Sequence, residues 1–276
     1  MSNYTYFIVG VSSILCLLIQ VAIFVLFNKS KGRSLQYVYD RDGVIILFAF
    51  IAFYGNAIFF SILYNDLNFL LYYFSFSLIA LLLEYSLGWM YYQLFGARLY
   101  RYYNNDLLGF SSLKMLPYWG GASVYFLFMW NIFKFNISVN NLNFYILYYL
   151  AFMSAMALCL IIIFSFIDLF NRKVKKLKKW SLNKYIIVSL PFSFGVIGSL
   201  LYTNNFYIFP YFIISTLIGF FFEGILGLSL RKLHGEFSWR YYREPSFKGG
   251  STILAIPFWI GANYLAFILF LISGVV

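Results

Sequence analysis

The sequence is poor in the residues that most metal and redox sites use. It holds 1 histidine, 2 cysteines and 9 acidic residues among 276 positions. A single histidine excludes a histidine-rich di-iron desaturase and a haem protein with paired axial histidines, because both need several imidazole ligands. Cys16 and Cys159 provide neither the spacing of a zinc site nor a disulfide framework. We therefore expect no bound metal and no other cofactor.

Motifs for nucleotide and diphosphate chemistry are also missing. No G-x-x-x-x-G-K-[ST] stretch occurs, so the chain has no P-loop with which to hydrolyse ATP. It has no pair of Asp-rich motifs of the kind that membrane prenyltransferases use to hold magnesium diphosphate, and no G-x-S-x-G elbow. These absences remove particular enzyme classes and leave open whether the protein is an enzyme.

Charged residues are scarce and apolar residues are abundant. Hydrophobic residues make up 63% of the chain, aromatic residues 24% and charged residues 11%. Soluble domains are about 45–50% apolar and about 25% charged. A span needs roughly 20 apolar residues, and the bilayer offers unpaired backbone groups no partner, so each span should be helical. We predict an all-α polytopic integral membrane protein with eight spans, at 4–27, 43–63, 67–95, 115–133, 142–170, 185–203, 205–230 and 251–275.

The basic residues are distributed asymmetrically between the two sides of this predicted topology. Every lysine and arginine except Lys134 falls in four loops on one side, at 28–42, 96–114, 171–184 and 231–250. By the positive-inside rule these loops are cytoplasmic and both termini lie outside. The basic stretch in the third of these loops favours membrane lipids over nucleic acid as a partner, since it suits topology and anionic headgroups.

One pattern of residues around an intramembrane glutamate occurs twice. The spacing between the copies is 139 residues up to Tyr103 and 140 from Gly109 onward. The match predicts two parallel four-helix repeats, 1–140 and 141–276, related by an axis along the membrane normal. The first copy comprises Glu84, Gly88, Gly96, Tyr100, Arg101, Tyr102, Tyr103, Gly109, Ser111, Pro117, Trp119 and Gly121; the second comprises Glu223, Gly227, Gly235, Trp239, Arg240, Tyr241, Tyr242, Gly249, Ser251, Pro257, Trp259 and Gly261.

Glu84 and Glu223 are the leading candidates for acid-base or ion-binding residues. Each lies about 26 Å into a helix that enters from outside, near the cytoplasmic edge of the hydrocarbon. A carboxylate is costly on a lipid-facing surface, so each should face the interior of the bundle. Gly88 and Gly227 follow four residues later on the same helical face and would let a helix or a ligand approach the carboxylate. The alternative is a structural glutamate that pairs with a loop arginine.

The aromatic-basic loops hold the next candidates. Arg101 and Arg240 stand at the centre of the matching stretches, flanked by Tyr102, Trp239 and Tyr241. Aromatic residues with arginine are typical of a membrane interface. The two arginines could fold back onto the glutamates, or they could meet a phosphate headgroup, for which a guanidinium fork is well shaped. The sequence leaves both alternatives open.

Four further positions have weaker claims to function. Trp119 and Trp259 follow a proline at the start of a predicted helix, which favours a mostly structural role. His234, the single histidine, lies at the cytoplasmic end of the seventh predicted helix and could shuttle a proton to Glu223. Asp168, near the cytoplasmic end of the fifth span, is expected to meet the nearby lysine-rich loop.

The repeated pattern resembles the type IV ABC-transporter family of bacterial polytopic membrane proteins and its two-repeat animal relatives. In that family the loop typically reads Trp-Asp-Tyr, whereas Arg240 and Arg101 stand at the Asp position here. The replacement reverses the charge, so no role of that Asp is carried over. The resemblance implies transport and supplies no mechanism for individual residues. A looser likeness to membrane carotenoid hydratases and cyclases implies acid catalysis on an apolar chain within the bilayer.

Three functions therefore remain as expectations. In the first, the two glutamates bind a cation or a proton during transport of a small solute or a lipid. In the second, they serve as acid and base in an enzyme that acts on a polyprenyl, carotenoid or other lipid substrate, although acid and base normally need different environments. In the third, the chain is an accessory subunit of a membrane complex. A membrane-protein partner and a homo-oligomer both stay open.

Overall fold

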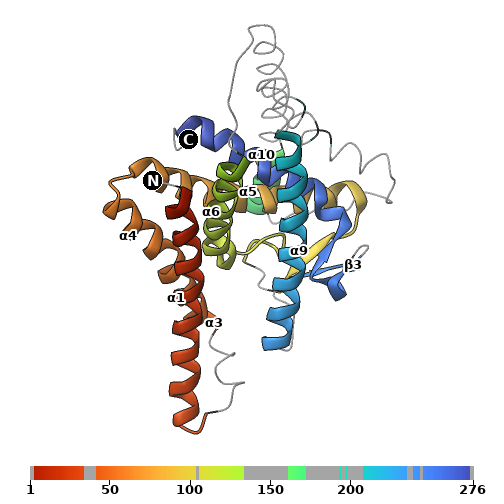
Figure 1. The fold of residues 1–276 in the computed structure, drawn as a ribbon. Coiled ribbons are helices and arrows are strands. Elements are labelled where there is room, and N and C mark those ends of the chain that lie inside the picture. Colours follow the sequence, from red (N-terminus) through yellow and green to blue (C-terminus); the bar gives the residue numbers. More distant parts are fainter. Residues whose placement is uncertain are drawn as a thin grey trace. The chain divides into compact units, whose positions relative to one another are not determined.

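A computed structural model describes residues 3–33, 42–103, 106–133, 161–171, 208–234, 239–242 and 245–273, with the single positions 190, 193 and 197. This part of the chain is mostly helical (Figure 1). It contains four helices that are long and apolar enough to cross a membrane, at Thr5–Ser30, Ile46–Leu63, Leu67–Phe95 and Pro210–Leu228. These helices support the prediction of a helical membrane protein.

The first two apolar stretches form the expected helices. Helix α1 covers Asn3–Ser30. The second stretch is built from α3 (Asp42–Phe50), a π-helical turn (Ile51–Gly55) and α4 (Asn56–Leu63), with helical backbone angles at both junctions. Large apolar side chains of α1 are exposed along its length. A surface of this kind is favourable in lipid and unfavourable in water. The side chains include Leu15, Leu18, Ile19, Ile23 and Leu26.

Helix α5 (Leu67–Phe95) carries Glu84 and begins at a tight turn. The Asp66 carboxylate caps the helix by accepting a hydrogen bond of 2.9 Å from the Phe69 backbone N–H. Asn65 has a φ of 50°, a left-handed conformation that asparagine tolerates better than most residues. The short turn therefore lies where the sequence placed one, between the second and third apolar stretches.

The remaining helices match several of the other predicted spans. Helix α6 (Leu116–Phe133) and helix α10 (Ile256–Ser273) fall in the fourth and eighth. Helix α9 (Ile208–His234) overlaps the seventh and extends past its predicted end at residue 230. A helix at Ile161–Asn171 covers the end of the fifth. The sixth, at 185–203, and the first part of the fifth lie outside the described residues except for three positions. The number of eight spans therefore stays a prediction.

Two short strand pairs were not anticipated from the sequence. Strand β1 (Tyr100–Tyr102) pairs antiparallel with β2 (Trp239–Tyr241). Strand β3 (Pro245–Ser246) pairs with β4 (Ser251–Thr252) across a tight turn. The aromatic-basic loops after the two glutamate-bearing helices thus contain ordered backbone pairing.

Local structure after each glutamate follows the spacing of the sequence match. The strands β1 and β2 occupy matching positions, as do the short 3-10 turns Leu113–Met115 and Ile253–Ala255. Gly109 and Gly249 both have positive φ angles, of 71° and 101°. A side chain would strain the backbone there. Whether the halves 1–140 and 141–276 are two four-helix repeats stays a prediction.

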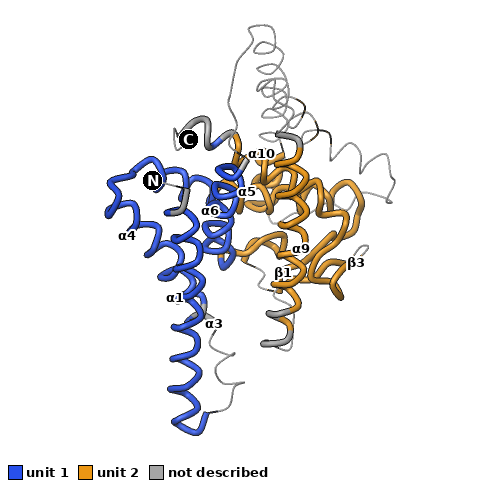
Figure 2. The backbone as a smooth tube through the Cα atoms, viewed as in Figure 1, with its two compact units in different colours: residues 1–78, 114–132, 268–276 blue, residues 79–113, 133–267 orange. Residues whose placement is uncertain are grey.

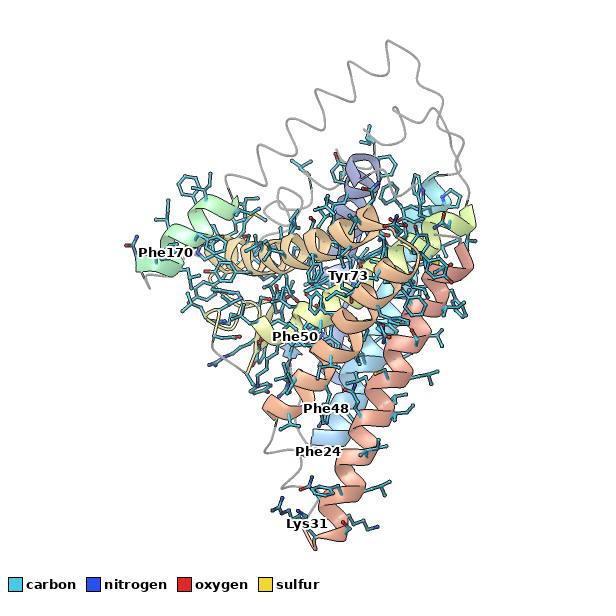
Figure 3. The ribbon with its side chains drawn as sticks, turned by 90° about the vertical axis from the view of Figure 1, so that its left-hand side faces the viewer. Phe24, Lys31, Phe48, Phe50, Tyr73 and Phe170 are labelled. Carbon is cyan, nitrogen blue, oxygen red and sulfur yellow. The ribbon has the colours of Figure 1, made fainter. Side chains whose placement is uncertain are left out.

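The chain divides into two compact units (Figure 2). Unit 1 comprises residues 1–78, 114–132 and 268–276, and its core is rich in aromatic side chains. Phe24 of α1 and Phe48 of α3 meet edge to face with ring centroids 5.7 Å apart (Figure 3). Unit 2 comprises residues 79–113 and 133–267 and contains both Glu84 and Glu223.

Candidate functional site

Glu84 is held by hydroxyl groups of the loop that follows its own helix. The Tyr102 hydroxyl donates to Glu84 Oε1 at 2.5 Å, and the Ser111 hydroxyl donates to Glu84 Oε2 at 2.5 Å. The Tyr100 hydroxyl donates to the Glu84 backbone carbonyl at 2.7 Å. The carboxylate is partly buried. Buried polar groups are stabilised by such hydrogen bonds, and these three contacts fix the loop on α5.

Glu223 is held in the same way in the second stretch. The Tyr241 hydroxyl donates to Glu223 Oε1 at 2.6 Å, and the Ser251 hydroxyl donates to Oε2 at 2.8 Å. The Trp259 indole Nε1 adds a hydrogen bond of 3.2 Å to Oε2. Each glutamate is therefore bound by a tyrosine on one carboxylate oxygen and a serine on the other, at matching positions of the two stretches.

The pairing of β1 with β2 joins the two carboxylate sites. Tyr100 lies opposite Tyr241, and Tyr102 lies opposite Trp239. The Tyr100 and Tyr241 rings are 5.4 Å apart between centroids, and the Tyr102 and Trp239 rings 6.2 Å. The backbone N–H of Tyr242 also donates to Leu99 O at 2.9 Å. The aromatic side chains between the two glutamates thus form one cluster.

Burial raises the pKa values of the three tyrosines in this cluster. The pKa of Tyr102 and that of Tyr241 lie well above the ordinary value of 10.0, first because both phenols are buried and next because each lies beside a glutamate. The pKa of Tyr100 is raised by burial and then by both Glu84 and Glu223. All three phenols therefore keep their protons at neutral pH and remain hydrogen-bond donors.

Gly88 and Gly227 let the loop approach the helix, as the sequence suggested for a neighbouring group. A Cβ atom at Gly88 would lie 2.8 Å from the Tyr100 hydroxyl oxygen. A Cβ atom at Gly227 would lie 2.8 Å from the Cα atom of Gly250. The neighbour that occupies the space is a loop side chain in the first case and loop backbone in the second.

The tryptophans have different roles. Trp239 donates from Nε1 to the backbone carbonyl of Gly250 at 3.0 Å, which ties β2 to the turn before β4. Trp259 is a direct hydrogen-bond partner of Glu223, and the mostly structural role expected for it stays a prediction. Trp119 lies in unit 1, where its ring centroid is 6.5 Å from that of Phe76.

Arg101 and Arg240 are exposed residues at the centres of β1 and β2, between buried aromatic neighbours. Side chains alternate between the two faces of a strand. The tyrosines that reach the glutamates therefore project from one face, and the arginines project from the other. His234 is the last residue of α9, and its side chain is outside the described part of the structure.

Asp168 accepts hydrogen bonds from two side chains of α5, and its expected contact with the lysine-rich loop stays a prediction. Its Oδ2 atom accepts hydrogen bonds of 3.0 Å from Trp89 Nε1 and from Gln93 Nε2 of α5. The lysine-rich loop that we expected to meet it lies outside the described residues. Among the residues that are described, no group of three or more His, Cys, Asp or Glu side chains is arranged to hold a metal ion.

Sequence reasoning missed three residues of this site. Ser111 and Ser251 were part of the repeated pattern but were not identified as partners of the glutamates, and Tyr100 was read only as an interfacial aromatic residue. The signal was available for the serines, because they follow their glutamates at nearly the same spacing, 27 residues for Ser111 and 28 for Ser251. A comparison of the chain with protein families, curated proteins and solved structures finds no match, so the resemblance noted in the sequence stays a prediction.

Proposed function

We propose that this chain is a membrane transport protein in which Glu84 and Glu223 bind a proton or a small cation while a small solute or a lipid moves. In this proposal it crosses the membrane eight times as two parallel four-helix repeats, with the basic loops cytoplasmic and both termini outside. The local symmetry of β1 and β2 supports this arrangement, because Arg101 pairs with its own counterpart Arg240. Antiparallel pairing of matching strands in this register is the pattern that a two-fold axis produces.

The observation that carries the proposal is the set of donors around Glu223. In the described part of the structure its hydrogen bonds come from Tyr241, Ser251 and Trp259, all of them uncharged. The tyrosine and serine hydroxyls can donate to a carboxylate and can also accept from a protonated carboxyl group. The same surroundings therefore suit both the protonated and the ionised form of Glu223. A site that takes up and releases a proton or a cation requires this.

The acid-base enzyme is less well supported. One carboxyl group acting as an acid and the other as a base requires environments that differ, so that their protonation states differ. Glu84 and Glu223 each accept from a tyrosine on Oε1 and a serine on Oε2. This similarity fits two equivalent binding groups better than a division between acid and base.

The test is charge movement in protein reconstituted into liposomes on a solid-supported membrane. Concentration jumps of H⁺, Na⁺ and K⁺ should give a transient current with at least one cation, and Glu84→Gln/Glu223→Gln should abolish it. Glutamine keeps the shape and an acceptor oxygen while it removes the charge. The matched control is Asp168→Asn, the same change at a carboxylate held by Trp89 and Gln93, and it should keep the current.

Two results would contradict the proposal. The first is a wild-type current no larger than that of the double variant for all three cations, together with no proton exchange reported by an enclosed pH dye. The second is a covalent change in membrane lipids, seen by mass spectrometry when wild-type cells are compared with cells that lack the protein, and abolished by the double variant. That result would show an enzyme.

A further inference from the structure

The centre of the β1–β2 pair places two arginines side by side. Arg101 lies opposite Arg240, and both are exposed between buried neighbours. Residues that lie directly opposite each other in an antiparallel pair share a face, with Cβ atoms about 5 Å apart. The two guanidinium groups therefore belong to one exposed surface, on the face of the strand pair turned away from the tyrosine hydroxyls that hold the glutamates.

Two like charges directly across a strand pair destabilise it. Strands of three residues gain little from their few backbone hydrogen bonds, so this arrangement weakens an element that joins the two glutamate sites. An anion between the arginines reverses the sign of the interaction. The planar guanidinium fork matches the oxygens of a phosphate group and can bind two of them at once.

Both arginine stems rest on matching glycines. A Cβ atom at Gly109 would lie 3.3 Å from Arg101 Cγ, and a Cβ atom at Gly249 would lie 3.4 Å from Arg240 Cγ. These are the glycines whose positive φ angles form the turn after each strand. The aliphatic parts of the Arg101 and Arg240 side chains therefore pack in equivalent positions on the two loops. A side chain that is already placed loses less entropy when it binds a ligand.

A third guanidinium group lies close to this pair. Arg98 stacks over the Phe110 ring at 4.3 Å, and its Nη1 donates to Leu108 O at 2.9 Å. Burial, and after it the charge of Arg101, lowers the pKa of Arg98. The positive potential of Arg98 and Arg101 is thus concentrated on one loop, which favours an anion beside it.

The neighbouring tyrosines indicate where the phosphate comes from. Tyr103 and Tyr242 each lie two positions after an arginine and are 47% and 49% exposed. Tyrosine with arginine is typical of the level of the lipid headgroups. Strand β1 also begins only a few residues after the end of the apolar helix Leu67–Phe95.

We infer that Arg101 and Arg240 together bind a phosphate group, supplied by the headgroup of an anionic phospholipid, on the exposed face of β1–β2. The other alternative for these arginines, pairing with the glutamates, is less well supported, because the strands turn the tyrosines toward the carboxylates. The inference does not rest on the proposed transport function, since it concerns the opposite face of the strand pair and its readout is lipid binding.

The test is native mass spectrometry of the detergent-purified protein with phosphatidylglycerol, phosphatidylcholine or inorganic phosphate added. Wild-type protein should retain phosphatidylglycerol, and Arg101→Gln/Arg240→Gln should bind it roughly tenfold more weakly, the loss expected for about one charged hydrogen bond. The charge-matched control is Lys31→Gln/Arg33→Gln, at two exposed basic residues after α1, and it should bind like wild type.

A second variant separates a phosphate site from general attraction to charge. Arg101→Lys/Arg240→Lys keeps both charges and removes both forks, so its affinity should fall between those of the wild type and the glutamine variant. Inorganic phosphate that displaces phosphatidylglycerol from wild-type protein alone, and not from the glutamine variant, supports the shared phosphate chemistry. Strong binding of inorganic phosphate without any lipid binding would assign the site to a soluble phosphate and overturn the lipid source.

Two outcomes overturn the site itself. One is equal phosphatidylglycerol binding by the wild type and the glutamine variant. The other outcome comes from a cross-linking experiment that needs only wild-type protein, so it can be measured even if the variant does not fold. A photoreactive phosphatidylglycerol should cross-link within 96–114 or 239–250. Cross-links found only elsewhere would contradict the inference.

Discussion

The Glu84 and Glu223 surroundings share their tyrosine and serine donors and differ in the residues around them. Tyr100 stands where the second copy has Trp239, and Phe110 stands where it has Gly250. The Tyr100 hydroxyl reaches the backbone of Glu84, whereas the Trp239 indole reaches the backbone of Gly250. Both carboxyl groups thus accept from a tyrosine and a serine, and Glu223 also accepts from the Trp259 indole. Tyr100 contacts the helix before its loop, whereas Trp239 contacts its own loop.

This comparison separates two requirements on the sequence. The donor to each carboxylate oxygen has to be a group that binds an acid, and both copies use a phenol and a hydroxyl there. The contact that fixes the loop only has to satisfy a backbone carbonyl, and either a phenol or an indole does so. The matching glycines likewise make room for different groups, the Tyr100 side chain at Gly88 and the Gly250 backbone at Gly227.

Alkaline pH should produce the largest difference between the two surroundings. A buried phenol with a raised pKa keeps its proton in the folded state while the unfolded state loses it, so its contribution to stability is complete below pH 10 and falls as pH rises further. Each such phenol should cost about 1.4 kcal/mol per pH unit. The Glu84 surroundings hold Tyr100 and Tyr102, and the Glu223 surroundings hold Tyr241.

Unfolding free energies measured between about pH 10 and pH 12 check this expectation. Tyr100→Phe/Tyr102→Phe should remove about twice as much of the pH dependence as Tyr241→Phe. Equal slopes in all the variants would show that these phenols are not buried as described.

Alanine at the two helix glycines should give the next largest difference. A methyl group at Gly227 meets the backbone of Gly250, which cannot rotate away, so we expect a loss of about 3 kcal/mol. At Gly88 the methyl group meets the end of the Tyr100 side chain, which can move at the loss of one hydrogen bond, for about 1 kcal/mol. Thermal unfolding in detergent measures both changes.

Gly55→Ala is the control for this pair of variants. Gly55 lies in the π-helical turn, and a Cβ atom there would have no neighbour within 4 Å. Its stability should be unchanged or slightly raised, because alanine favours helix. If Gly88→Ala proved more destabilising than Gly227→Ala, the assignment of a backbone contact to Gly227 would be wrong.

The smallest expected effect concerns the indole donor to Glu223. Trp259→Phe removes one hydrogen bond, and a double-mutant cycle with Glu223→Gln should give a coupling of about 1 kcal/mol. The same cycle with Asp168→Asn should be additive, because Asp168 is bound by Trp89 and Gln93. Additive behaviour in both cycles would remove Trp259 from the glutamate site.

The sequence predicted the helices well because apolar composition alone requires them in a bilayer. The third predicted span has the bounds of α5, and the turn before it lies at Asn65 as expected. The sequence also identified Glu84 and Glu223, because a charged residue within an apolar stretch is visible without any tertiary information. The sequence did not reveal which side chains bind the two carboxyl groups. The donors lie in loops many residues away, and the path of the backbone determines which of them come close.

The sequence by itself determined the class of the protein, the position of its acids and the spacing of the residues that accompany them. Only the tertiary structure decided that the loops after the two acids pair as strands. A strand of three residues has no detectable period in the sequence, and its partner lies 139 positions away. That pairing turns Tyr102 and Tyr241 toward the carboxylates and Arg101 and Arg240 to the opposite face, because alternate side chains of a strand must point in opposite directions.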